Sequence, residues 1–292
     1  MRKIERLVYT NQNGESVEFS HDSLYHTDDV SGLADVRNTI YSVNSMGQDG
    51  DTYVGNRIES REIEIVGCIR SRKKEEMLAL RRRLNKVLNP QLSATLTYSY
   101  GDFIRVIDCK ANNAPVYAKP GVFAGFTVNL LCLDPFWREN AETKAAVASW
   151  LGSLEFETEI PMDTGMELGY REPSRIVNVF NAGDVGTGIR AEFRATGTVS
   201  NPEILNVDTG EYLRFNNLTL SAGDLLTVST HYGRKVCTLK QNGAVTDALR
   251  YLDVDSAFLQ LVPGDNLFRY SATAGENNLE VSVYHNNKYL GV

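Results

Sequence analysis

The chain has 292 residues, of which 42% are hydrophobic, 23% charged and 9% aromatic. This composition is typical of a folded globular protein and excludes a disordered or collagen-like chain. From the length we expect about two domains. No apolar run approaches the ~18 residues of a membrane-spanning helix. The charged N-terminal segment has no apolar stretch behind it, so we also expect no secretory signal.

The charge is distributed unevenly along the chain. Thirty basic and 37 acidic side chains give a net charge of −7. Residues 1–140 carry 18 of each sign, whereas residues 141–292 carry 12 basic and 19 acidic side chains, a difference of −7. An acidic surface repels phosphate backbones, so we expect no nucleic-acid binding. The step in charge indicates that the two halves are separate units.

Strand patterns and tight turns dominate the first half. Residues Arg61–Ile69 alternate between charged and apolar side chains, which is typical of a half-buried strand. The segment Thr95–Asp108 contains two further strand patterns that only Gly101-Asp102 separates, which predicts an extended hairpin with a tight turn. Asn13-Gly14 and Asn242-Gly243 are the other strong hairpin signals.

One helix is predicted over residues 72–88. Ser71 is a candidate N-cap, and the helix should end before Asn89-Pro90, because proline restricts the residue before it. Arg81-Arg82-Arg83 is either a solvated helix face or a contact for an acidic partner, and the pattern leaves both interpretations open. One face of this helix is apolar at helical spacing: Met77, Leu80, Leu84, Val87 and Leu88.

The second half begins after a looser segment. Residues 126–133 form a strong apolar strand pattern, and the Gly- and Pro-containing stretch 141–173 follows as a connecting segment. We therefore expect a first domain over 1–140, a linker over 141–173 and a second domain over 174–292. Short strand patterns separated by turns predict a β-sandwich in the second domain. These patterns are Ile176–Phe180, Ile189–Ala195, Tyr212–Phe215, Leu225–Ser229, Lys235–Leu239, Leu267–Tyr270 and Leu279–Tyr284.

No catalytic constellation is found in the sequence. The motifs of serine hydrolases, phosphate-binding loops and zinc proteases do not occur. His21 and His26 lie near three aspartates, but the pattern lacks the spacing of a third metal ligand and favours solvated loop residues. Asp49-Gly50-Asp51 resembles part of a calcium loop, yet Tyr53 and Ser60 occupy positions that need oxygen ligands. We expect no catalytic, cofactor-binding or metal-binding residues, no cofactor and no enzyme activity.

The cysteines and aromatic residues favour structural roles. Cys68, Cys109, Cys132 and Cys237 form no CxxC pair, and we interpret them as buried thiols, with a disulfide or metal role as the alternative. The aromatic side chains of the second half should be mostly core, although one or two could line a sugar-binding face. Both tryptophans precede residue 174, so we expect no strong lectin activity there.

Several segments together resemble the siphophage distal tail proteins. In the first half they are Asp49-Gly50 before the strand at 61–69, the single helix at 72–88, and Leu133-Asp134-Pro135-Phe136-Trp137. In the second half they are Asn181–Asp184, Pro202–Ile204, Leu225–Thr230, Leu261–Asn266 and Asn287–Val292. The resemblance covers nearly the whole chain apart from residues 141–173.

The resemblance implies a mainly β, two-domain structural protein of a non-contractile phage or prophage tail. The first domain would be sandwich-like, with one helix and an extended hairpin, and would build a hexameric ring. The second would be a galectin-like or carbohydrate-module-like sandwich. Implied partners are other copies of the chain, the tail-tube protein, and tail-tip, fibre or receptor-binding proteins, with no sequence-specific nucleic acid and no membrane insertion. The implied location is the virion tail tip, after assembly in the host cytoplasm.

Two other functions stay open at this stage. The second domain could bind carbohydrate of the host wall directly, with a tyrosine such as Tyr232 in place of the usual stacking tryptophan. A cell-wall-degrading enzyme is a further alternative. For a ring protein, we expect the first domain to carry assembly through strand edges and the helix near residues 72–88, and the hairpin Thr95–Asp108 to pair across subunits.

Overall fold

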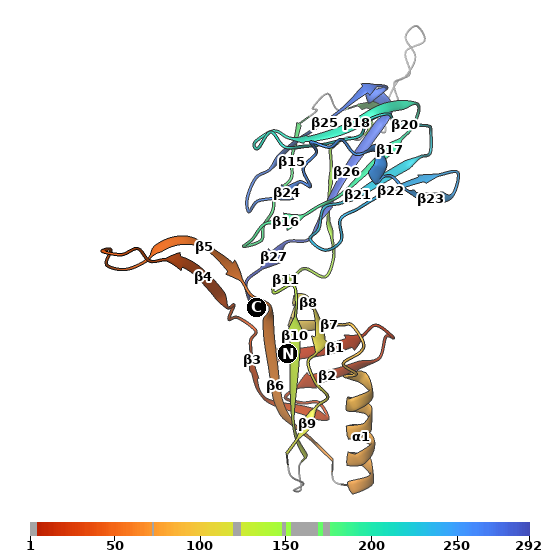
Figure 1. The fold of residues 1–292 in the computed structure, drawn as a ribbon. Helices are drawn as coiled ribbons and strands as arrows, with labels where there is room; N and C mark the ends of the chain where they lie inside the picture. The colour runs from red at the N-terminus through yellow and green to blue at the C-terminus, as the bar shows by residue number, and fades with distance from the viewer. Residues whose placement is uncertain (1–4, 72, 119–123, 148–149, 153–168, 172–175) are drawn as a thin grey trace, which may run out of the picture. The chain divides into compact units, whose positions relative to one another are not determined.

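The computed structural model describes residues 5–292 apart from 72, 119–123, 148–149, 153–168 and 172–175 (Figure 1). The chain forms two compact units, one of Met1–Asn140 with Lys288–Val292 and the other of Ala141–Asn287. The prediction of a mainly β, two-domain chain with one α-helix is confirmed. The chain therefore passes between the units twice, once after Asn140 and once after Asn287.

The first unit contains a ten-stranded sheet with the order β27-β11-β8-β7-β1-β2-β3-β6-β10-β9. A further pairing of β8 with β10 closes the part of the sheet from β8 through to β10 on itself, so these strands form a closed sheet. The strands are β1 (Glu5–Asn11), β2 (Ser16–Ser20), β3 (Tyr25–Ser31), β6 (Arg61–Ile69), β7 (Ala94–Tyr100), β8 (Phe103–Ala111), β9 (Val116–Tyr117), β10 (Ala124–Cys132), β11 (Trp137–Arg138) and β27 (Lys288–Tyr289).

Alternating side chains fill the inside of this closed sheet. In β6 every second residue from Arg61 to Ile69 is buried, as its sequence pattern predicted. Tyr9, Phe19, Phe126 and Trp137 are among its largest fully buried side chains. The resulting core holds the first unit together around one apolar cluster.

The helix α1 (Lys74–Val87) packs its apolar face on this core, as predicted. Leu84 and Val87 are buried, and the glutamates of the first turn and Lys86 of the last turn complement the helix dipole. The predicted N-cap is wrong: Lys73 occupies the cap position without a side-chain bond, while the Ser71 hydroxyl accepts from the Lys73 N–H at 3.2 Å. The helix begins two residues later than predicted, and residue 72 lies outside the described part.

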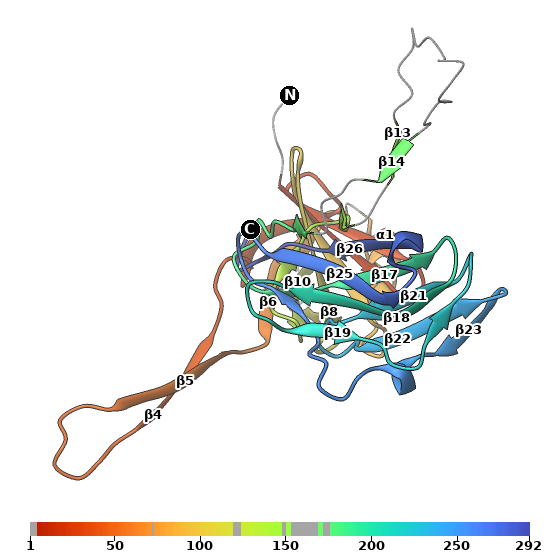
Figure 2. The same cartoon turned by 90° about the horizontal axis from the view of Figure 1, so that it is seen from above.

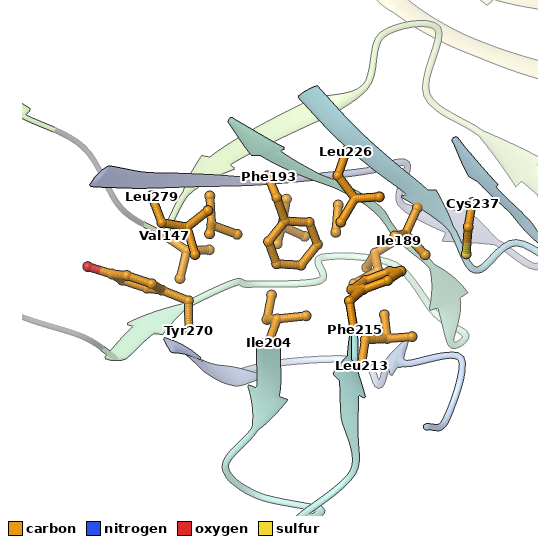
Figure 3. Packing of buried hydrophobic residues seen from close by; sticks show 14 of the residues in the cluster. Val147, Ile189, Phe193, Ile204, Leu213, Phe215, Leu226, Cys237, Tyr270 and Leu279 are labelled. Atoms are coloured by element: carbon orange, nitrogen blue, oxygen red, sulfur yellow. The ribbon is translucent and has the colours of Figure 1, made fainter. Parts of the chain in front are cut away.

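The second unit is a sandwich of two sheets (Figure 3). One sheet has the order β12-β26-β17-β21-β22-β23, and the other has the order β15-β25-β18-β19, with β20 paired to β18. The strands are β12 (Thr143–Ala146), β15 (Ile176–Asn178), β17 (Arg190–Ala195), β18 (Val199–Asn206), β19 (Tyr212–Arg214), β20 (Thr219–Leu220), β21 (Leu225–Ser229), β22 (Val236–Gln241), β23 (Ala244–Asp247), β25 (Leu267–Ala274) and β26 (Leu279–His285).

Buried side chains from both sheets meet between them. Figure 3 shows Phe193 and Leu226 from one sheet facing Ile204 and Leu213 from the other. Phe193 and Phe215 pack edge to face, with ring centroids 6.1 Å apart. Two further two-stranded sheets pair β16 (Thr187–Gly188) with β24 (Gln260–Leu261) and β13 (Trp150–Gly152) with β14 (Gly169–Arg171). Short 3-10 turns are formed by Leu249–Tyr251 and Glu276–Asn278.

The main segment of the first unit ends at Asn140, the expected boundary, but the second unit begins directly after it and ends at Asn287. Residues 143–146, which were expected to belong to the linker, pair with β26 as an edge strand of the second unit. The last five residues belong to the first unit, where β27 pairs with β11. Most of the expected linker 141–173 lies outside the described residues. A division into folded pieces that proteolysis can separate between 140 and 174 stays a prediction.

Candidate assembly surfaces

A two-stranded arm is the most exposed apolar feature of the first unit. It consists of β4 (Asn38–Val43) and β5 (Thr52–Ile58), which pair only with each other among the described strands. Figures 1 and 2 show it extending away from the closed sheet from which it arises. Its exposed large apolar side chains are Ile40, Tyr41, Val43, Met46, Tyr53 and Val54. Such a group of apolar side chains without a core behind it is typical of a contact surface.

Hydrogen bonds between side chains of the arm lie near its tip and along β5. The Ser42 hydroxyl donates to the Asp51 carboxylate at 2.9 Å, and the Tyr53 hydroxyl donates to the Asn56 side chain at 2.6 Å. The register shifts between Tyr41 and Ser42, which is the mark of a bulge. An isolated hairpin is marginally stable in water, so a surface that covers the arm would stabilise it.

The base of the arm is held by Arg61, the first residue of β6. Its side chain is 2% exposed, and burial lowers the pKa of the guanidinium. Nε donates to the Pro135 carbonyl at 2.7 Å, and Nη2 donates to the Leu290 carbonyl. Nη1 donates to the carbonyls of the segment that enters the arm: Gly32 at 2.8 Å, Leu33 at 3.0 Å and Asp35 at 3.1 Å.

Arg61 therefore connects three parts of the first unit at one point. These are the segment before β4, the turn after β10 and the C-terminal tail. The planar guanidinium fork suits this arrangement, because it presents several donors in fixed directions. The sequence pattern indicates Arg61 as the first residue of an alternating strand, but a charged residue at a strand start does not reveal which carbonyls it binds.

The hairpin Thr95–Asp108 is largely paired within the first unit, and its pairing between subunits stays a prediction. Strand β7 pairs along its whole length with β1 on one side and with β8 on the other. Strand β8 uses its second edge for β10 and β11. Both edges of β7 are thus used, whereas the second edge of β8 is paired only at Val106, Lys110 and Ala111 among the described residues. The turn itself is as predicted, with Gly101 at a φ of 64°.

The arginine run on α1 makes contacts within the first unit. The Arg81 guanidinium lies 4.0 Å from the centre of the Tyr117 ring, and Arg83 donates to the Ser16 carbonyl at 3.2 Å. Arg82, Arg83 and Lys86 line a hollow of about 490 Å³ with Glu15, which forms an ion pair with Lys86. Two of the three arginines thus have structural contacts, and a role for Arg82 toward an acidic partner stays a prediction.

The residues considered for metal binding do not form a ligand set. The rings of His21 and His26 meet edge to face with centroids 4.6 Å apart, and Nδ1 of His26 lies 2.7 Å from the His21 carbonyl. Nε2 of His26 lies 3.3 Å from the Asp28 carboxylate. Within the described residues no group of three or more His, Cys, Asp or Glu side chains is placed to hold a metal ion. Asp49–Asp51 belong to the tip of the arm.

Among the described residues of the second unit, Tyr232 is the most exposed aromatic side chain, and Phe180 follows at 57%. Tyr232 is 77% exposed, and the Lys235 ammonium lies 5.6 Å from its ring centre. Phe215, Phe268 and Tyr270 are buried, as expected for core aromatics. No helix in the described part of the chain is long and apolar enough to cross a membrane.

Two family models match the chain, one on each unit. The model of the phage tail protein RIFT-related domain matches residues 12–132. The model of the siphovirus-type tail component, C-terminal domain, matches residues 182–289. No curated protein sequence matches this chain.

Solved structures of phage tail components share the fold. The Dit protein of phage SPP1, described as a paradigm of the hub adsorption apparatus in phages that infect Gram-positive bacteria, superposes with a TM-score of 0.68. The two chains are 16% identical, over 97% of this chain and 98% of that one. Chains of the phage p2 baseplate, in its activated conformation with Ca or Sr, give TM-scores of 0.56 and 0.53 at 11% and 10% identity, with full coverage of both chains.

Proposed function

The chain belongs to the siphophage distal tail proteins, and we propose that it builds the hub ring at the distal end of a non-contractile tail. The observation that carries this proposal is the pairing of two tail-family units in one chain, in the order of the solved Dit protein of phage SPP1. The role is structural rather than enzymatic. Its place is the tail tip of the virion, after assembly in the host cytoplasm, where free thiols persist.

The arm β4–β5 is the ring contact in this proposal. A closed ring of identical subunits needs a head-to-tail contact between two different surfaces of the chain. The arm supplies one of these surfaces, because it presents apolar side chains and two open strand edges outside the closed sheet. Covering those edges on a neighbouring copy removes an aggregation hazard at the same time.

The stoichiometry and the partners complete the proposal. Six copies form the ring, the first unit carries assembly, and the second unit extends toward tail-tip, fibre or receptor-binding proteins. The tail-tube protein binds the ring on the tail side. Neither sequence-specific nucleic acid nor membrane insertion takes part in this function.

Light scattering after size exclusion tests the ring on the full chain. We expect a single species with the mass of six copies, and negative-stain images of it should show a closed ring. A strictly monomeric protein at every concentration, in the absence and in the presence of the tube protein, would contradict the proposal. Open filaments would contradict the closed geometry but not the head-to-tail contact.

Tyr232 favours one alternative function, carbohydrate binding by the second unit. An exposed aromatic ring beside Lys235 is a surface on which a sugar ring can stack. A glycan array and calorimetry with host wall polysaccharide test this function, with Tyr232→Ala as the matched variant. Glycan binding that Tyr232→Ala abolishes would support the carbohydrate-binding function. The other alternative, wall degradation, is tested by a zymogram, in which the absence of cleared bands would exclude it.

A further inference from the structure

The pairing of β8 with β10 that closes the sheet of the first unit, called the seam below, is short. Strands β8 and β10 pair only at Leu130↔Ala111 and Leu131↔Lys110. By contrast, β10 pairs with β6 from Ala124↔Ile69 through to Cys132↔Arg61. Few ladder bonds therefore hold β8 to β10, and we expect this seam to be one of the places where the closed sheet opens locally.

Two cysteines occupy the next step of the seam. Continuing the antiparallel register by one residue places Cys132 opposite Cys109. Leu130 and Ala111 are buried, and so are Cys132 at 0% and Cys109 at 5% exposure, which shows that both thiols lie on the inner face. The Cys132 side chain also raises the pKa of the Cys109 thiol, as expected of a close neighbour.

An antiparallel register that continues by one residue would bring Cys109 and Cys132 within disulfide range. Opposed residues of an antiparallel pair have Cα atoms about 4.5–5.5 Å apart. Disulfides span Cα separations of about 4.4–6.8 Å. The other two cysteines have no such partner across their strands: Cys68 opposes Gly125 and His26, and Cys237 opposes Val228.

We propose that Cys109 and Cys132 are a latent cross-strand disulfide site, oxidised by a low-molecular-weight disulfide, which locks the β8–β10 seam. One thiolate attacks a sulfur of the reagent, forms a mixed disulfide and releases one small thiol. The second thiolate then attacks the protein sulfur of that mixed disulfide and releases the other small thiol. The two cysteines lose two electrons and two protons in total, and the reagent gains them as two thiols.

Burial controls when this oxidation takes place. The neighbouring Cys132 thiol and removal from water raise the pKa of Cys109, so the thiolate is scarce in the closed sheet. Reaction should therefore need opening of the seam, and it should be slow in native buffer and faster in mild denaturant. A chain folded in a reducing cytoplasm keeps both thiols until it meets an oxidising medium.

Thiol mapping of the full-length protein tests the site. The folded protein is incubated with oxidised glutathione, with and without mild urea, then alkylated after denaturation and digested without reduction. We expect two of the four cysteines to escape alkylation, and one peptide pair to join Cys109 to Cys132. The midpoint of thermal unfolding of the first unit should rise, and dithiothreitol should reverse both changes.

Matched variants identify the pair. Cys237→Ser should lose the same two thiols to oxidation, whereas Cys109→Ser should abolish the intramolecular bond. Four alkylated cysteines after oxidation in mild urea, or a bond that involves Cys68 or Cys237, would overturn the proposal. Light scattering of the same samples reports whether the chain is a monomer or a ring. Both cysteines lie in the first unit of the same chain, so the disulfide should form in a monomer as well, and its test does not depend on the ring.

Discussion

Arg61 shows how one buried charge can organise a surface element. Its guanidinium donates to five backbone carbonyls that come from the arm entry, the turn after β10 and the C-terminal tail. Hydrogen bonds from a charged donor are stronger than neutral ones, and buried carbonyls without partners are costly. Arg61 therefore acts as a positioning residue for the arm rather than as a contact residue.

We predict that Arg61→Met lowers the free energy of unfolding of the first unit by about 3 kcal/mol. Several carbonyls would remain buried without a donor, although methionine fills much of the space. Urea denaturation followed by Trp137 fluorescence, in a Trp150→Phe background, measures the change. Arg6→Met is the control, since the exposed pair of Arg6 with Glu18 contributes less than about 1 kcal/mol. Equal effects of the two substitutions would contradict the assigned role.

Because the phenol of Tyr9 is buried, we predict that the first unit loses stability at alkaline pH. Burial raises the pKa of its phenol from 10.0 to about 12, and its hydroxyl makes no hydrogen bond of ordinary geometry among the described residues. The folded state holds the phenol proton of Tyr9 more tightly than the unfolded chain does. The stability that this difference contributes is therefore fully present below pH 10.0 and is lost as pH rises toward about 12. Tyr9→Phe should reduce this loss and should raise stability at neutral pH by up to about 1 kcal/mol. Urea midpoints measured across that pH range check both statements.

At the scale of elements, the arm is the feature whose accessibility matters most for the proposed ring. Its apolar side chains have no partner layer in the two-stranded sheet β4–β5. A valine at the end of such a strand gains about 1.5–3 kcal/mol when a neighbouring copy buries it fully. A charge at the same position would have to be buried without a partner.

Val54→Asp should therefore disassemble the ring and leave the subunit folded. Each contact should weaken at least about tenfold, which corresponds to 1.4 kcal/mol, and light scattering should report monomers. Val245→Asp is a matched control, because Val54 and Val245 are 63% and 64% exposed and both lie in exposed strands. A ring that survives Val54→Asp, or that Val245→Asp disrupts equally, would remove the arm from the contact.

Thr97→Pro should unfold the first unit instead of weakening a contact between subunits. Thr97 pairs with Val8 on one side and with Val106 on the other, so a proline removes a donor inside the closed sheet. Far-ultraviolet circular dichroism and Trp137 fluorescence should show the loss of structure in monomers. Normal folding with loss only of the ring would support the hairpin as a contact element.

Local signals in the sequence predicted the elements that local chemistry determines. The alternation of β6 and the spacing of Leu84 and Val87 on α1 gave the right elements. At Asn242-Gly243 both residues have positive φ, 49° and 81°, as the predicted tight hairpin requires.

Non-local pairing explains what the sequence did not predict. Strand β18 was missed because Asn201-Pro202 is typical of a turn, yet Pro202 pairs opposite Ala272 and Asn201 takes a positive φ of 52° within the strand. The arm was missed because neither of its faces is buried, so no alternation marks it. Closure through β8 and β10, and the burial of Arg61, depend on contacts between distant segments that no periodicity encodes.

At the scale of the whole molecule, the division of charge follows the two units. With Lys288 counted in the first unit, that unit has 19 basic and 18 acidic side chains, or +1, and residues 141–287 have 11 and 19, or −8. Copies of a nearly neutral unit can pack side by side without accumulating like charge, whereas copies of the acidic unit repel one another. This contrast supports assembly through the first unit, with the second units kept apart.

The return of the chain to the first unit gives the last prediction. Residues 288–292 supply β27, an ion pair of Lys288 with Asp134 at 2.7 Å, and a hydrogen bond from the Tyr289 hydroxyl to Glu139 at 2.7 Å. Leu290 also accepts one of the Arg61 hydrogen bonds. Deleting these five residues from the full chain removes all of these contacts from a unit whose other residues end at Asn140.

We expect this deletion to lower the stability of the first unit by about 2–4 kcal/mol and to weaken the ring, because the base of the arm loses one of its three supports. The second unit ends at Asn287 and should unfold at its original temperature. Differential scanning calorimetry, with Trp137 fluorescence to identify the first unit, separates the two transitions. Tyr289→Phe serves as the milder variant, since it keeps β27 and loses only the hydroxyl contact. A deletion that moves only the transition of the second unit would show that the C-terminal residues belong to that unit instead.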